Sequence, residues 1–310
     1  MLAFVAATAL ALAVAGVAGG ATGSLTYKDC ITGETASGPA GSDACVAIAS
    51  ATAAGANSGL GGPGAVAVSP DGESLYALSG EDDAIARFSR KTSNGKLTYE
   101  GCITGETETG PTGSDACAAI PSATAAGANS GMDSPGSVAV SPDGKAVYVL
   151  GKSDDSVVHF KRKRSTGELT FEECLTGETA SASACTAIPG AAAAGEGAGL
   201  NDPQGLALTG GAPLYVATLG DEAVVRLTRD TETGELTYED CVTGDTAAGP
   251  TGSGACDEIP SATAAGTASG LSNPIDLAVS GGSLYVAGQG DTAIARFSRG
   301  PGGVLAYKNC

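Results

Sequence analysis

Clusters of carboxylates recur along the chain, once in each of four long repeats. Oxygen-rich sites of this kind suit Ca²⁺ or a cationic partner. The clusters are Glu81, Asp82 and Asp83; Asp154 and Asp155; Asp221 and Glu222; and Asp291. The candidate cation ligands are Asp83, Asp155, Asp221 and Asp291, with Asp276 as a further carboxylate. No copy matches an EF-hand loop, so a solvated acidic surface that keeps the protein soluble is the favoured interpretation of these carboxylates.

Nucleophilic catalysis by a Ser-His-Asp arrangement needs a histidine beside a serine. His159 is the only histidine, and in the other repeats its place is held by arginine at Arg87, Arg226 and Arg296. A polar surface role explains this pattern better than a triad does. The sequence therefore assigns no catalytic residue.

Eight of the nine cysteines fall in four closely spaced pairs. Zinc sites usually combine CxxC clusters with several histidines, whereas this chain has no CxxC and one histidine. Local disulfides formed in an oxidising compartment are the better interpretation, each worth about 3 kcal/mol in the chain-entropy model. The predicted pairs are Cys30–Cys45, Cys102–Cys117, Cys174–Cys185 and Cys241–Cys256.

The overall composition limits the fold and the partners. The chain has 310 residues, 48 glycines, no tryptophan and a net charge of −18. Such a composition suits many short, tightly turned strands. The negative charge argues against a nucleic-acid partner, because phosphate binding needs a basic surface. No organic cofactor is expected, and Ca²⁺ is the one ion that the carboxylates suggest.

The first 21 residues carry no charge and end in small residues. Residues 1–21 resemble a secretory signal, although the usual basic start is missing. An N-terminal membrane anchor is the alternative, because an uncharged run of this length could span a bilayer. Both interpretations predict a secreted or extracytoplasmic protein, or one held at the cell surface, with no membrane contact beyond this segment.

Each repeat contains four short β-type runs divided by turn residues. In the first repeat the runs are "AVAVS", "SLYAL", "AIARFS" and "KLTYE", with Pro-Asp-Gly between the first two. Four antiparallel strands, graded from buried to exposed and repeated radially, predict an all-β fold of β-propeller blades. The predicted propeller occupies residues 22–310, with blades at about 62–102, 134–174, 202–241 and 273–310, separated by the cysteine inserts.

The motifs "VAVSPDGxxxY", "DDxIxxF" and "TGxLT" resemble the blades of YVTN/lactonase-like propellers. This resemblance implies a ring of about six or seven blades, so four blades would be an incomplete part of a larger ring. Cys310, which has no partner at the usual spacing, leads to the same expectation.

Metal-dependent lactonases of this type use carboxylates or amides around the mouth of a central channel. At the matching starts of the inner strands, only Gln204 and Asp276 depart from small or apolar residues. The candidate ligand-binding residues are therefore Gln204, Asp276, Asp133, Asp202 and Asn273. No catalytic motif of the family can be transferred to this chain.

Two functions follow from these patterns. The first is a secreted binding or scaffold protein that uses the insert-bearing acidic face, with an extracellular protein, a glycan or a small molecule as its partner. The alternative is a lactonase-like hydrolase, metal-dependent or not, with its site on the same face.

Overall fold

The computed structural model describes residues 25–35, 45–107, 116–179, 185–193, 198–246, 255–264 and 266–310. Apart from a 3₁₀ turn at Pro301–Gly303, the regular elements in these ranges are β-strands. Residues 1–21, where the sequence predicts a signal peptide or an anchor, lie outside the described residues. None of the described segments forms a helix of the length and apolarity that crossing a membrane requires.

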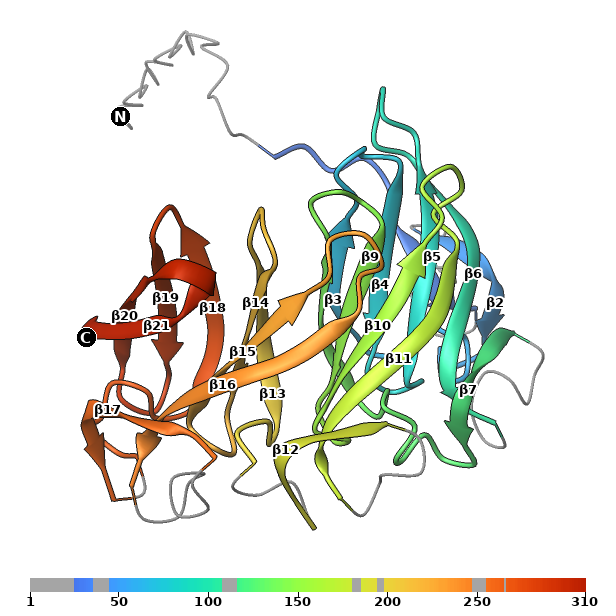
Figure 1. The fold of residues 1–310 in the computed structure, drawn as a ribbon. Helices are drawn as coiled ribbons and strands as arrows, with labels where there is room; N and C mark the ends of the chain where they lie inside the picture. Colours follow the sequence, from blue (N-terminus) through green and yellow to red (C-terminus); the bar gives the residue numbers. More distant parts are fainter. Residues whose placement is uncertain are drawn as a thin grey trace, which may run out of the picture.

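The strands form four large sheets and one small sheet (Figure 1). The small sheet pairs β1 (Ile31–Glu34) with β2 (Val46–Thr52). The first large sheet contains β3 (Pro63–Val68), β4 (Ser74–Ser79), β5 (Ala84–Arg90), β6 (Leu97–Glu106) and β7 (Cys117–Thr124). The second contains β8 (Pro135–Val140), β9 (Ala146–Gly151), β10 (Ser156–Arg162), β11 (Leu169–Glu178) and β12 (Thr186–Ala192).

The third and fourth large sheets repeat this order. The third contains β13 (Pro203–Leu208), β14 (Pro213–Thr218), β15 (Ala223–Arg229), β16 (Leu236–Asp245) and β17 (Asp257–Thr263). The fourth contains β18 (Pro274–Ser280), β19 (Ser283–Gly288), β20 (Ala293–Arg299) and β21 (Leu305–Asn309). The first four strands of each sheet pair antiparallel in sequence order, as the four β-type runs of each repeat predict.

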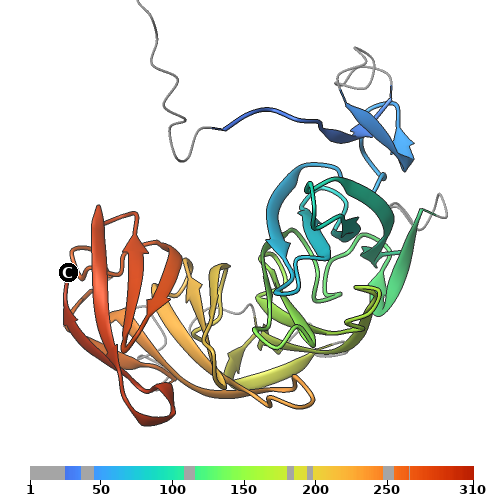
Figure 2. The same cartoon turned by 90° about the horizontal axis from the view of Figure 1, so that it is seen from above.

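The predicted propeller is wrong. The strands wind as a β-solenoid of about 13 turns and not as blades of a propeller. One physical reason lies in the cysteine inserts, because part of each insert returns as a fifth strand, so three of the sheets have five strands instead of four. Seen along the stack in Figure 2, the sheets follow one another in an open arc, with those of β3 and β18 far apart.

The fifth strand pairs parallel to the fourth, and a disulfide joins the two. In the first large sheet Cys102 lies directly opposite Cys117, with their Cα atoms 4.6 Å apart. All four predicted disulfides are present in the structure. Four disulfides are typical of proteins from extracellular or other oxidising compartments.

A glycine packs against the disulfide of each of the first three large sheets and against the sulfur of Cys310 in the fourth. A Cβ atom on Gly59 would lie 2.5 Å from Sγ of Cys102, and the backbone of Gly59 has a φ of 81°. Only glycine tolerates both the left-handed backbone and the close contact. Gly131, Gly199 and Gly270 occupy the equivalent places, and at Gly270 the neighbouring sulfur is that of the free Cys310.

Buried tyrosine hydroxyls link each sheet to the next. Tyr76 on β4 is fully buried and donates a hydrogen bond of 2.6 Å to the carbonyl of Gly167, in the loop after β10. Tyr148 donates to Gly234 at 2.6 Å in the same way. The tyrosine ring supplies apolar contact, while its hydroxyl satisfies a carbonyl that the sheet leaves free.

A buried ion pair accompanies the tyrosine between the first and second sheets. The side chain of Arg162 is fully buried and contacts Asp71 at 3.0 Å, and its Nε donates to the hydroxyl of Tyr76 at 2.8 Å. Burial acts to raise the pKa of Asp71, but hydrogen bonds from Ser69, from the Glu73 amide and from Arg162 together lower it to about 2. Arg229 and Asp143 repeat the ion pair one sheet later at 3.2 Å.

We expect Tyr148→Phe to reduce the free energy of unfolding by about 1 kcal/mol, because the substitution leaves the buried carbonyl of Gly234 without its donor. Tyr285 is the matched control, since it holds the same place on the fourth sheet but is 38% exposed. Tyr285→Phe should change the stability by less than about 0.5 kcal/mol. Urea unfolding of both variants measures the difference. Equal losses in the two variants would contradict the role of the hydroxyl between sheets.

Candidate functional site

The acidic loops between the second and third strands have two distinct positions. At the first position stand Asp82, Asp154, Asp221 and Asp291, and each carboxylate accepts backbone hydrogen bonds from the insert that enters the same sheet. Asp82, for example, accepts from the amides of Asn57, Gly59 and Gly61 at 2.7 to 2.8 Å. These carboxylates shape the insert loops, and this includes the predicted cation ligands Asp221 and Asp291.

The second position links neighbouring sheets. Asp83 Oδ1 accepts a hydrogen bond of 2.7 Å from the Ser134 amide, at the start of the next sheet. Asp155 accepts from the Asp202 amide at 2.7 Å, and Glu222 accepts from the Ser272 hydroxyl at 3.1 Å. These three acids all have positive φ angles of 45° to 47°. Asp83 and Asp155 therefore bridge neighbouring sheets. The sequence pattern placed them in one set of candidate cation ligands with Asp221 and Asp291, which bind the insert loops instead.

Burial and like charge perturb both bridging aspartates. Burial raises the pKa of Asp83 to about 7, and the nearby carboxylates of Asp133 and Glu106 add to the shift. Burial also raises the pKa of Asp155 to about 7, with contributions from Glu178 and the neighbouring aspartates. At neutral pH each of these sites is therefore close to half protonated.

The five predicted ligand-binding residues lie at or just before the starts of the inner strands β8, β13 and β18. Gln204 donates a hydrogen bond to the carboxylate of Asp202. Asp276 is exposed on β18 and accepts from the Leu277 amide at 2.8 Å. Asp133 accepts from the Ser134 hydroxyl, and Asn273 has a φ of 48° in the turn before β18. Each of these contacts is local to the start of one inner strand.

A metal role for the carboxylates stays a prediction. Within the described ranges, no three His, Cys, Asp or Glu side chains are grouped so that they could hold a metal ion. His159 is 1% exposed, stacks on Tyr148 and lies 3.6 Å from Glu173. The loop of Gly234 covers the imidazole and accounts for this burial.

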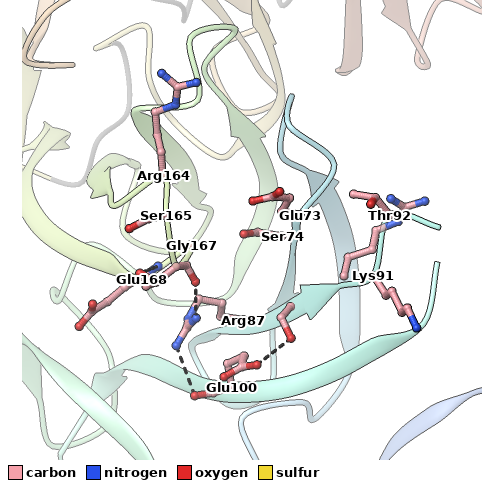
Figure 3. A pocket seen from close by; sticks show the side chains of 13 residues that line it. Glu73, Ser74, Arg87, Lys91, Thr92, Glu100, Arg164, Ser165, Gly167 and Glu168 are labelled. Carbon is pink, nitrogen blue, oxygen red and sulfur yellow. Dashed lines mark hydrogen bonds between the residues drawn. The ribbon is translucent and has the colours of Figure 1, made fainter. Parts of the chain in front are cut away.

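A cavity of about 700 Å³, which the sequence patterns did not indicate, lies between the first and second sheets (Figure 3). The loops after β5 and β10 line it, at the strand ends opposite the acidic loops. Its basic side chains are Arg87, Arg90, Lys91 and Arg164. A smaller cavity of about 180 Å³ adjoins Arg87 and is lined by Gly101. The sequence carries a signal for this smaller cavity, because Gly101 stands directly before the cysteine, where the other repeats have Glu173, Asp240 and Asn309.

Comparisons with known proteins support the fold at a distance. No protein-family model and no curated protein sequence matches the chain. A crystal structure of a putative 6-phosphogluconolactonase from Bacteroides uniformis is 16% identical with a TM-score of 0.50, and the match covers 79% of this chain and 53% of that one. A protein from Lactobacillus plantarum is 16% identical with a TM-score of 0.51, with coverage of 80% and 56%.

A third solved structure is the periplasmic gluconolactonase of Pseudomonas aeruginosa, which is 18% identical with a TM-score of 0.50 and coverage of 80% and 53%. These neighbours are lactonase-like and other propeller-type proteins. The chain spans about half the length of the solved structures it matches. At this identity the similarity shows a shared arrangement of sheets, and the YVTN resemblance rests on the motifs quoted above.

The raised pKa values predict a loss of stability with rising pH. An unfolded aspartate titrates near 4, whereas folded Asp83 and Asp155 titrate at about 7. Between these values the folded state binds more protons, so the stability that protonation supplies is lost as the pH rises from about 4 through about 7. The melting temperature should be lower at pH 8 than at pH 5, by on the order of 5 °C.

The control for this prediction separates the two sites from the general acidity of the chain. Asp83→Asn and Asp155→Asn together should flatten the pH dependence, because an amide oxygen can still accept the bridging hydrogen bond without a charge. Asp230→Asn should leave it unchanged, because hydrogen bonds from the Thr233 and Glu232 amides lower the pKa of Asp230 below this window. An unaltered slope in the double variant would rule out the two bridging sites as its source.

Proposed function

We propose that this chain is an extracytoplasmic binding or scaffold protein whose insert-bearing face recognises a cationic group. One repeated observation carries the proposal: at each of three sheet boundaries, a bridging acid is in electrostatic contact with an acid at the end of the fourth strand. The pairs are Asp83 with Glu106, Asp155 with Glu178 and Glu222 with Asp245. A bound cation would relieve the repulsion within each pair.

The rigidity of this face supports binding as its role. The carboxylates of the first position and the disulfides fix the inserts against the sheets, so the bridging acids occupy set positions along the stack. A ligand that meets a preorganised surface loses less of its binding energy to ordering. The four disulfides and the uncharged N-terminal sequence support export of the chain.

Calcium is the simplest probe of the proposal. If the paired acids accept a divalent cation, Ca²⁺ at about 10 mM should raise the melting temperature by several degrees, because a ligand that prefers the native state stabilises it. Asp83→Asn with Asp155→Asn should remove most of this shift. Asp230→Asn, which changes an exposed carboxylate outside the face, serves as the control for charge alone. A shift that survives in the double variant, or no shift at all, would contradict the proposed site.

A lactonase-like hydrolase is the second candidate, and the structural similarity to a gluconolactonase and a putative 6-phosphogluconolactonase favours it. On this alternative Gln204 and Asp276, at the starts of the inner strands, would contact the substrate. Hydrolysis of glucono-δ-lactone, measured with and without Ca²⁺, distinguishes the candidates. A binding protein should give only the spontaneous rate, whereas turnover that Asp276→Asn abolishes would favour the hydrolase.

A further inference from the structure

The third and fourth strands of every large sheet place one pair of residues face to face. The strand register sets Arg226 opposite Asp240 and His159 opposite Glu173. In the fourth sheet Arg296 lies opposite Asn309. A basic or imidazole side chain thus meets a carboxylate or amide in three sheets. In the first sheet, however, Arg87 lies opposite Gly101.

The occupied positions show what a carboxylate does there. Asp240 accepts two hydrogen bonds from Arg226, at 2.9 Å from Nε and 2.6 Å from Nη2. Glu173 accepts a hydrogen bond of 2.7 Å from the Leu236 amide of the next sheet and lies 3.6 Å from His159. The carboxylate of Glu173 therefore lies between His159 and the following sheet, and that of Asp240 lies against Arg226.

The first sheet has the basic residue, Arg87, but has Gly101 in place of the carboxylate or amide residue. Arg87 donates to the carbonyls of Thr166, at 2.7 Å, and Glu100, at 3.5 Å. In the part of the chain that the structure describes, Arg87 forms no ion pair with a carboxylate. Gly101 has a φ of 132°, a backbone conformation that side chains rarely adopt, and a Cβ atom built on it would meet nothing within 4 Å. No side chain at this position therefore stands opposite Arg87.

Two cavities border the side chain of Arg87. Arg87 lines both the cavity of about 700 Å³ and a smaller one of about 180 Å³, which Gly101 and Leu169 also line. Leu169 corresponds to Leu236, the residue whose amide binds Glu173 one sheet later. Figure 3 shows Arg87 between the loop of Gly167 and the strand of Glu100.

The other charged side chains of the cavity fall into two groups. Arg90, Lys91 and Arg164 add positive charge, while Glu73, Glu100 and Glu168 add negative charge. Glu168 contacts Lys163 at 3.6 Å, and Glu100 accepts a hydrogen bond of 2.7 Å from Ser89. Ionised carboxylates can only accept hydrogen bonds, so these acids suit a ligand that also carries hydroxyl groups.

We propose that Arg87 and the hollow beside Gly101 bind the carboxylate of a small hydroxylated organic acid. The ligand carboxylate takes the place that Asp240 and Glu173 fill in the other sheets, between the third-strand base and the next sheet. The guanidinium group favours a carboxylate because two parallel hydrogen bonds match its geometry, as Arg226 shows with Asp240. The hydroxyl groups of the ligand face the acids of the larger cavity.

This site is independent of the proposed function, since it lies at the strand ends opposite the acidic loops. The net charge of −18 disfavours general association with anions. If an organic anion binds, the binding must therefore come from a local basic site, because the net negative charge of the protein repels anions.

Isothermal titration with tartrate, a four-carbon dicarboxylate with two hydroxyl groups, tests the proposal. Tartrate should bind with one site per chain at concentrations below about 20 mM, while threitol, which has the same skeleton without carboxylates, should not bind. Arg87→Gln should weaken tartrate binding at least about tenfold, because it removes a charge-assisted pair of hydrogen bonds. Arg296→Gln, in the equivalent place on the fourth sheet, should leave the affinity unchanged.

Gly101→Asp adds a carboxylate opposite Arg87, on a backbone whose φ of 132° strains any side chain, and should abolish tartrate binding. Thermal melting checks that this variant folds, and Arg87→Gln tests the site without any change at Gly101. Inorganic phosphate is titrated in parallel to separate the two oxyanions. No tartrate binding, equal affinities in Arg87→Gln and the unmodified protein, or Arg87-dependent binding of phosphate alone would each overturn the proposal.

Discussion

The contact between neighbouring sheets is the constraint on which the rest of the structure depends. Each large sheet buries one apolar face against the next, and at the first boundary Tyr76, Arg162 and Asp71 satisfy the polar groups that this packing removes from water. A buried arginine without its acid would be strongly unfavourable, so the pair fixes the relative position of two sheets. On the fourth sheet, where no later sheet of the described chain covers them, Tyr285 and Ile294 are 38% and 58% exposed.

The sheet boundaries also determine where chemistry can occur. On the insert side, the bridging acids Asp83 and Asp155 lie among other carboxylates, and burial with like charge brings their pKa values to about 7. On the opposite side, the replacement of an acid by Gly101 leaves Arg87 facing a cavity. On the insert side, the repeated contact between sheets places additional carboxylates beside the bridging acids. On the opposite side, the repeated pair of a base and an acid lacks its acid. Differences between repeats are therefore more informative about function than the repeated motif itself.

The sequence predicted the strands and the disulfides because both depend on local patterns: apolar runs divided by Pro-Asp-Gly, and cysteines at short spacing. The sequence did not predict the overall arrangement of the sheets. Nothing in segments such as Cys117–Thr124 indicates that each insert returns as a fifth strand, parallel to the fourth. The roles of the acids were also hidden. Asp82 and Asp83 are adjacent in the chain, yet one shapes a loop and the other binds the next sheet, since their side chains leave the turn in different directions.

Polar contacts between sheets hold the stack together, and a double-mutant cycle on Asp71 and Arg162 measures the strength of one such contact. Urea unfolding of Asp71→Asn, Arg162→Gln and the double variant gives the coupling energy between the two side chains. We predict a favourable coupling of more than about 1 kcal/mol, because the guanidinium group is fully buried at the boundary. A coupling indistinguishable from zero, with the losses of the single variants simply adding, would contradict the account.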